Sequence, residues 1–296
     1  MQPRDRLLAL AVPVLWGLNF PATAYSLQHY PPFLAAALRF TLLAIPTILL
    51  VPRPQVRTIW LIGTGFGLGV LQFGFLYVAM EAGMPPGLAS LVLQAQAPFT
   101  MLLATLLLGE RLTARRAAGV GIAVLGLAFI GAHRAQAASW VPVALTLLAA
   151  LGWATGNICS RLARAPKPLQ LTMWMSLVPP IPTFLLSLWF EGPRIAPALS
   201  TALTREALRA NLGLLYIVVC ASILGYGIWN TLIARYSASA VAPWSMLVPV
   251  VGVLSSWVAF GEAPALVELA AGVLVVGGVL IATFERRRRL SRADLR

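Results

Sequence analysis

The chain has few charged residues for its length. Asp and Glu together number 9, and all charged residues make up 10% of the 296 positions, whereas hydrophobic residues make up 59%. A soluble globule of this size needs more polar surface than these residues can provide. The composition therefore excludes a water-soluble globular domain and indicates a protein that lies within a lipid bilayer.

Cysteine and histidine are also scarce, with 2 of each. Cys159 and Cys220 both fall inside apolar stretches, so we expect no disulfide framework, no metal site and no cofactor. The carboxylates and histidines lie at or near the ends of the apolar stretches. No catalytic constellation is visible at depth in the bilayer, which argues against an enzyme.

Long apolar stretches are abundant, each near the ~20 residues needed to cross a membrane. They lie at about 7–28, 33–52, 58–80, 85–108, 116–132, 140–163, 169–190, 211–234, 238–260 and 265–284. The first stretch is too long for the apolar part of a signal peptide, so we interpret it as a retained helix. The sequence predicts an all-α polytopic membrane protein with ten transmembrane helices. The links are short except at 131–139 and at 191–210, where we expect an external loop with a surface helix.

The two halves of the chain share a pattern. Pro98 and Pro249 are 151 positions apart, and Glu110 and Glu262 are 152 apart, each in a Gly-Glu pair. Ala-Ala-Gly-Val occurs at 117–120 and again at 270–273. Such an internal duplication in an apolar chain is typical of a transporter.

Basic residues are distributed unequally between the two sides of the predicted membrane. If the N-terminus is cytoplasmic, the inner segments contain Arg4, Arg6, Arg53, Arg57, Arg111, Arg115, Arg116, Arg161, Arg164, Lys167, Arg235, Arg286 to Arg289, Arg292 and Arg296. The outer segments contain only Arg134, Arg194, Arg205 and Arg209. This bias places both termini in the cytoplasm. Five helices per half would invert the second half relative to the first, and the net charge of +13 indicates contact with anionic lipid rather than nucleic acid.

Arg39 is the one ionisable residue predicted to lie well inside a transmembrane stretch. A charged side chain at that depth is costly and normally faces a partner or a water-filled cavity. Arg39 could attract the carboxylate of a substrate. It could equally serve a structural role, bonded to backbone carbonyls or extended toward the interface.

Polar and aromatic residues share faces of several predicted helices. Trp16 and Asn19 are three positions apart, and Trp153 and Asn157 are four apart, so each pair lies on one helical face. Other candidates for a binding pocket are Tyr226, Trp229 and Asn230, together with Gln72 and Tyr77. Together they predict a pocket with apolar walls and a few hydrogen-bonding groups, although any single Trp or Asn is more often structural.

Two prolines interrupt matching stretches in the two halves. Within a helix, Pro98 and Pro249 would leave the carbonyls of Gln94 and Ser245 unpaired. Breaks at corresponding positions are the best indication from sequence of a transporter site. Gln94 and Gln96 lie on different faces, and the spacing to Pro98 favours Gln94 as the one that lines the pathway.

Several motifs resemble those of the EamA family of the drug/metabolite transporter superfamily. They include Leu-Trp-Gly-Leu-Asn-Phe at 15–20, Leu-Arg-Phe at 38–40, GLASLVLQAQA at 87–97, Gly-Glu-Arg at 109–111 and GYGIW at 225–229. The set is most similar to bacterial exporters of O-acetylserine and cysteine. The resemblance implies two EamA repeats, at 5–132 and 140–285, followed by a basic cytoplasmic tail at 286–296.

The resemblance implies a secondary transporter of the bacterial inner membrane that exports small amino acids or related metabolites by alternating access. The alternative within the superfamily is export of aromatic amino acids or aromatic cationic drugs, because the candidate pocket is rich in Trp and Tyr. We expect a small-molecule substrate and the lipid bilayer as partners. Small-residue stripes at Gly119 and Ala123, and at Gly278 and Ala282, are expected to pack within a monomer.

Overall fold

A computed structural model describes residues 1–283 except 111–112, 138–139, 237–240, 242–243 and 262. The basic tail at 286–296 lies outside the described residues. All the regular structure in the described part is helical. The composition thus led to the correct fold class, an all-α protein with multiple apolar helices.

Apolar runs and proline positions set most of the helix bounds. In the first half the elements are α1 (Pro3–Gly17), α2 (Asn19–Leu27), α3 (Pro32–Leu50), α4 (Thr58–Gly65), η1 (Phe66–Leu71), α5 (Gln72–Glu81), α6 (Pro86–Val92), η2 (Leu93–Ala95), α7 (Gln96–Leu108) and α8 (Ala114–Ala137). In the second half they are α9 (Val141–Ala163), α10 (Pro168–Trp174), η3 (Met175–Leu177), α11 (Pro180–Ser200), η4 (Arg205–Ala207), α12 (Leu208–Tyr216), η5 (Ile217–Leu224), α13 (Gly225–Arg235), α15 (Val248–Phe260) and α16 (Leu266–Thr283). Several helices begin at a proline. Proline is tolerated in the first turn of a helix because a backbone N–H at that position would have no partner within the helix.

Seven continuous helical stretches in the described part are long and apolar enough to cross a membrane. They are Pro3–Leu27, Pro32–Leu50, Thr58–Glu81, Pro86–Leu108, Val141–Ala163, Pro168–Ser200 and Arg205–Arg235. Two shorter apolar helices follow, at Val248–Phe260 and Leu266–Ala282. A protein that crosses the membrane several times is thus confirmed, and the count of ten helices stays a prediction.

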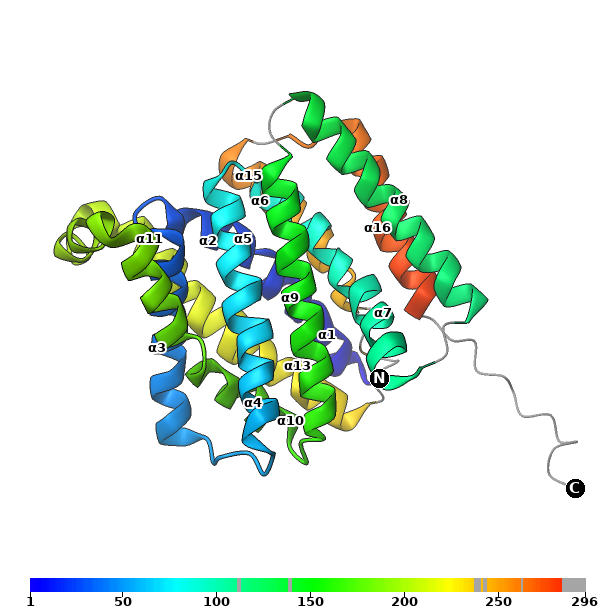
Figure 1. Ribbon diagram of the computed structural model, residues 1–296, viewed down its shortest axis with the longest axis horizontal. Coiled ribbons are helices and arrows are strands. Elements are labelled where there is room, and N and C mark those ends of the chain that lie inside the picture. The colour runs from blue at the N-terminus through cyan, green and yellow to red at the C-terminus, as the bar shows by residue number, and fades with distance from the viewer. Residues whose placement is uncertain (111–112, 138–139, 237–240, 242–243, 262, 284–296) are drawn as a thin grey trace, which may run out of the picture.

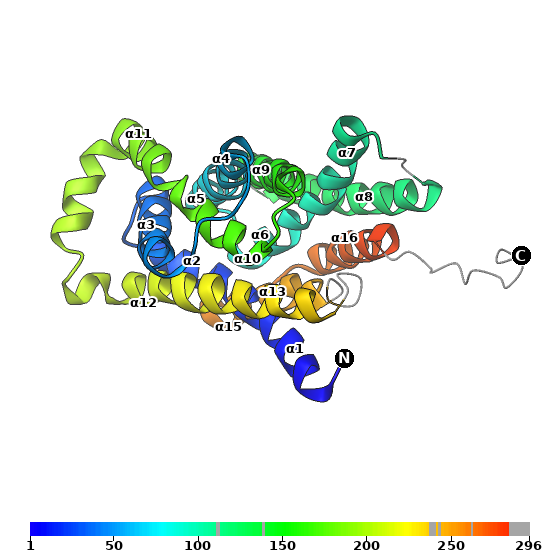
Figure 2. The ribbon, with the colours of Figure 1, turned by 90° about the horizontal axis from the view of Figure 1, so that it is seen from below.

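The region 191–210, where we expected an external loop with a surface helix, is mostly helical. α11 continues through this region to Ser200, and η4 with α12 begins at Arg205. Figure 2 shows the chain passing from α11, which lies beside α3, around one end of the molecule before it returns along α12 and α13. Buried residues on α11, including Ile195 and Ala198, explain why the helix does not end where the apolar run does.

A π-helical segment interrupts one long helix in each half. η1 begins at Phe66 and η5 at Ile217, 151 positions later, which is the separation between Pro98 and Pro249. In η5 the hydroxyl of Ser222 donates to the carbonyl oxygen of Ile217, 2.9 Å away. A π-helical turn is rare and frequently marks a functional site.

Helices from the two halves cross each other in antiparallel pairs. Gly87 of α6 lies against Ser256 of α15, whereas the hydroxyl of Ser90, one turn later on α6, donates to the carbonyl of Pro249 near the start of α15. α8 and α16 form a second antiparallel pair (Figure 1), and a Cβ on Gly119 would lie 2.5 Å from backbone atoms of Gly278 and Ala282. Small residues permit this approach, and the stripes expected from the sequence do face each other within one chain.

Candidate functional site

Arg39 lies in the middle of α3 and is 4% exposed. Its two terminal nitrogens donate to the hydroxyl of Tyr77 at 3.1 Å and to that of Ser222 at 3.3 Å. The guanidinium carbon lies 3.8 Å from the ring centroid of Phe73 and 5.5 Å from that of Phe40. α3, α5 and η5 thus hold the cation between two hydroxyls and two aromatic rings.

None of the carboxylates in the described part of the chain forms an ion pair with Arg39. Glu81 pairs with Arg194, and Glu110 pairs with Arg161 and Arg116. Asp5 accepts a hydrogen bond from the hydroxyl of Tyr236 at 2.5 Å and lies 3.4 Å from Arg235. Buried charges in proteins are usually paired, whereas in the described residues the contacts of Arg39 are with hydroxyl groups and aromatic rings.

Three aromatic side chains gather near the π-helical segment η5, which also contacts Arg39. The Trp16 ring centroid lies 5.3 Å from that of Tyr226 and 5.3 Å from that of Trp229, with tilted ring planes. The indole N–H of Trp16 donates to the carbonyl of Ala221 at 3.0 Å. Ala221 directly precedes Ser222, so the aromatic cluster and Arg39 contact adjacent residues of η5.

The remaining polar candidates lie in contacts between helices or within one helix. The amide of Gln94 approaches the sulfur of Met246 at 3.7 Å. The amide of Asn157 donates to Gln96 at 3.3 Å and to Thr100 at 3.2 Å. Asn230 donates to the carbonyl of Tyr226 at 2.8 Å. Thus Gln96, which the sequence argument set aside, is the glutamine that meets Asn157.

Other candidates hold positions around these contacts. Asn19 and Gln72 are buried in the first turns of α2 and α5. Trp153 packs against the main core cluster, and Ser245 is partly buried. Pro98 lies in the first turn of α7, directly after the 3₁₀ segment η2, and Pro249 is the second residue of α15.

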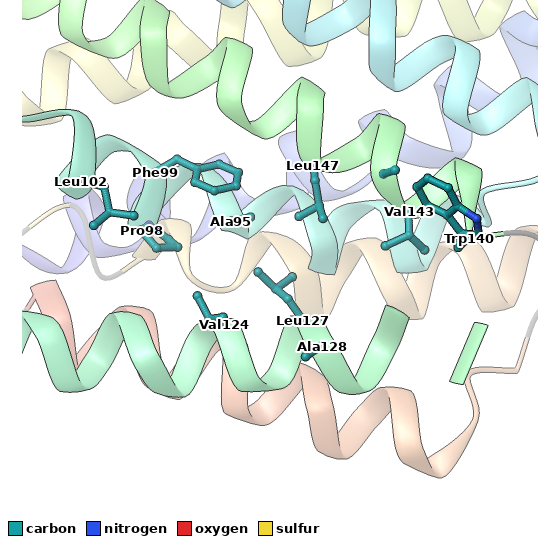
Figure 3. A pocket seen from close by; sticks show the side chains of 11 residues that line it. Ala95, Pro98, Phe99, Leu102, Val124, Leu127, Ala128, Trp140, Val143 and Leu147 are labelled. Carbon is teal, nitrogen blue, oxygen red and sulfur yellow. The ribbon is translucent and has the colours of Figure 1, made fainter. Parts of the chain in front are cut away.

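A cavity of about 470 Å³ lies between α7, α8 and α9 (Figure 3). Its walls are apolar and include Phe99, Leu127 and Leu147, with Trp140 at one end. Pro98 is the only predicted site residue among its lining residues. This cavity is therefore distinct from the shared cavity that the sequence led us to expect around Asn19, Gln94, Asn157, Tyr226 and Asn230.

Sequence reasoning missed Ser222 and Phe73, which contact Arg39, and it misplaced one of the three buried carboxylates in the described residues. Nothing in the sequence marks Ser222 or Phe73 as a site residue, although Phe73 directly follows the candidate Gln72. The argument that carboxylates lie near helix ends is wrong for Glu191, which is 4% exposed within α11. Its carboxylate accepts from the backbone N–H groups of Phe33 at 2.8 Å and Leu34 at 3.1 Å, so it caps α3 from another helix.

Comparison with known proteins identifies a family and several relatives. The sequence matches the EamA-like transporter family over residues 6–132 and 140–284. It is 43% identical to a probable amino-acid metabolite efflux pump of Salmonella typhimurium, with 99% of this chain and 100% of that protein covered. It is 39% identical to a probable amino-acid metabolite efflux pump of Escherichia coli, over 98% of each chain.

More distant relatives extend the comparison. A probable terminal-alkyne amino-acid exporter of Streptantibioticus cattleyicolor is 29% identical, over 94% of each chain. A solved crystal structure with 22% identity superposes with a TM-score of 0.62 and covers 99% of this chain and 100% of that one, which supports the fold. The family match covers both halves, and the chain belongs to the EamA-like transporter family.

Proposed function

We propose that this protein is a secondary transporter that exports small amino acids or related metabolites, of the O-acetylserine and cysteine type. The observation that carries the proposal is Arg39, a buried cation without a carboxylate partner in the described residues. A substrate carboxylate would supply the missing charge and hydrogen-bond acceptors. The names of the relatives, amino-acid metabolite efflux pumps, support the same substrate class.

The proposed architecture has ten transmembrane helices in two inverted repeats, at 5–132 and 140–285. The protein would lie in the bacterial inner membrane with both termini and the tail at 286–296 in the cytoplasm. Three observations support it: the double family match, the π segments 151 positions apart and the antiparallel contacts of α6 with α15 and of α8 with α16. The excess of Arg and Lys in the predicted inner segments supports the orientation.

The proposed mechanism is alternating access around a site between the halves. The interruptions η1, η2 and η5 provide places where helices can bend without breaking long runs of backbone hydrogen bonds. Trp16, Asn19, Arg39, Gln72, Tyr77, Tyr226, Trp229 and Asn230 form the proposed recognition region. Gln94, Trp153, Asn157 and Ser245, with the interruptions before Pro98 and Pro249, would line the path. We propose that a monomer suffices.

The aromatic cluster favours one alternative, export of aromatic amino acids or aromatic cationic drugs. Trp16, Tyr226 and Trp229 together present ring faces on which a substrate ring or cation could stack. An aromatic amino acid would still place its carboxylate on Arg39, whereas a cationic drug would be repelled by it. The charge of the substrate therefore separates the two branches of this alternative.

Flux from proteoliposomes tests the proposal. Purified protein would be reconstituted with radiolabelled O-acetylserine, cysteine or phenylalanine inside, with and without an imposed pH gradient. We expect release of O-acetylserine or cysteine well above that from protein-free vesicles. Release of phenylalanine alone would favour the aromatic alternative, and release of none of the three would contradict amino-acid export.

A further inference from the structure

The hydroxyl of Thr23 differs from those of the other buried threonines in the described residues. Thr47, Thr64, Thr146 and Thr183 each donate to the carbonyl four positions earlier, at 2.8, 2.7, 2.8 and 2.7 Å. Thr23 is 1% exposed, yet its hydroxyl has no hydrogen-bond partner. Its hydroxyl therefore does not make the backbone hydrogen bond that the other four make, and such a buried polar group requires an explanation.

Asn19 precedes Thr23 by one helical turn and is also buried, at 9% exposure. Its side-chain oxygen likewise has no partner. Residues four apart share a face of a helix, so both side chains lie on the same face of α2. Around α2, that face lies between Ser26, which bonds to Ala210 of α12, and Phe20, which lies near Gly252 of α15.

The third buried atom without a partner in this part of the fold is Nε of Arg39. α2 packs against α3, α5 and η5, the elements that carry Arg39 and its two hydroxyl partners. Of the buried side-chain polar atoms that lack a partner in the described residues, only Ser256 Oγ, on α15, lies on another element. The interior beside α2 and α3 therefore offers two oxygen acceptors and one cationic N–H donor.

These three atoms match the head group of an α-amino acid. An ammonium group donates three hydrogen bonds and fits acceptors such as an amide oxygen and a hydroxyl, whereas a carboxylate accepts from a guanidinium. We propose that the substrate ammonium binds the side-chain oxygens of Asn19 and Thr23 while its carboxylate binds Arg39. This inference rests on the proposed function and narrows it to substrates with an intact α-amino-acid head group.

Binding of three matched compounds tests the assignment. L-cysteine has both groups, 3-mercaptopropionate lacks the ammonium and cysteamine lacks the carboxylate. Quenching of tryptophan fluorescence in purified protein under reducing conditions would give a dissociation constant for each. Wild-type protein should bind L-cysteine at least tenfold more tightly than either analogue, because a site built around polar groups rejects a ligand that leaves them unpaired.

The variants separate the two ends of the head group. Thr23→Val and Asn19→Leu should each weaken binding of L-cysteine about fivefold or more and change binding of 3-mercaptopropionate less than twofold. Thr23→Ser, which keeps the hydroxyl, should bind like wild type. Thr146→Val is the matched control, because the Thr146 hydroxyl already donates a hydrogen bond to a backbone carbonyl within α9. This variant should bind L-cysteine as tightly as wild type.

The outcomes are distinct. If Thr23→Val and Asn19→Leu leave L-cysteine binding unchanged, or weaken L-cysteine and 3-mercaptopropionate equally, the ammonium assignment is wrong. Amino-acid release from proteoliposomes would then still support the proposed function. Failure of wild-type protein both to bind L-cysteine and to release any amino acid would overturn the two proposals together.

Discussion

Gln94 and Met246 are in contact although 152 positions separate them, with the Gln94 amide nitrogen 3.7 Å from the Met246 sulfur. In the register that pairs Pro98 with Pro249, Gln94 corresponds to Ser245, the residue next to Met246. When nearly corresponding positions of two repeats touch, the axis that relates the repeats passes close to both. This contact supports the proposal that the interrupted helices of the two halves meet at the centre of the molecule.

An inverted repeat requires Glu110 and Glu262 to lie on opposite sides of the membrane. Single cysteines at these positions, in a background without Cys159 and Cys220, should react with a membrane-impermeant thiol reagent from opposite sides. Intact cells and inverted vesicles provide the two directions of labelling. Reaction of both positions from the same side would contradict the inverted arrangement. Glu262 lies outside the described residues.

Glu191 should stabilise the fold through the N-terminus of α3. Glu191→Ala removes the acceptor for two backbone N–H groups and should lower the free energy of unfolding by about 1–3 kcal/mol. Glu191→Gln keeps one oxygen and should lose less. The exposed carboxylate of Glu206 provides the control, since Glu206→Ala should leave the unfolding temperature in detergent unchanged. Equal unfolding temperatures for Glu191→Ala and wild type would show that the cap contributes nothing.

The contact of α8 with α16 should tolerate no side chain at Gly119. A Cβ there would lie 2.5 Å from the nitrogen of Ala282 and from the oxygen of Gly278, so Gly119→Ala must separate the helices and lower the unfolding temperature. Gly121 lies on the same helix with nothing within 4 Å of its Cβ position. Gly121→Ala should therefore be neutral or stabilise the protein by up to about 1 kcal/mol, from helix propensity alone. The reverse order of the two unfolding temperatures would refute this packing.

The fold class followed from composition because apolar runs of this length have few alternatives to transmembrane helices. The duplication likewise followed from Pro98, Pro249 and the Gly-Glu pairs, which are local patterns. The extent of α11 could not be predicted, because Glu191 has a stabilising environment only once α3 is beside it. Arg39 was found because charge at depth is visible in a sequence.

The partners of Arg39 could not be found in the same way. Tyr77 was a candidate, but its contact with Arg39 depends on tertiary packing, as do those of Phe73 and Ser222. Thr23 is distinguished only by its unpaired hydroxyl. Helical spacing to Pro98 favoured Gln94 as the glutamine that lines the pathway, and it gave no sign that Gln96 contacts Asn157 of α9 across the 3₁₀ segment η2. An argument from regular α-helical spacing does not account for a 3₁₀ segment such as η2, which changes the faces on which the following side chains lie.

The central claim is that Arg39 binds the carboxylate of an exported amino acid. The most direct measurement is release of radiolabelled L-cysteine from proteoliposomes that contain equal amounts of wild-type, Arg39→Gln or Arg39→Lys protein, each checked for a single folded species by size-exclusion chromatography. Arg39→Gln should reduce release at least tenfold, and Arg39→Lys should also be impaired because an ammonium lacks the planar fork of a guanidinium. Binding of cysteamine, which has no carboxylate, should change less than twofold in both variants. Folded Arg39→Gln protein that releases L-cysteine at the wild-type rate would contradict the account.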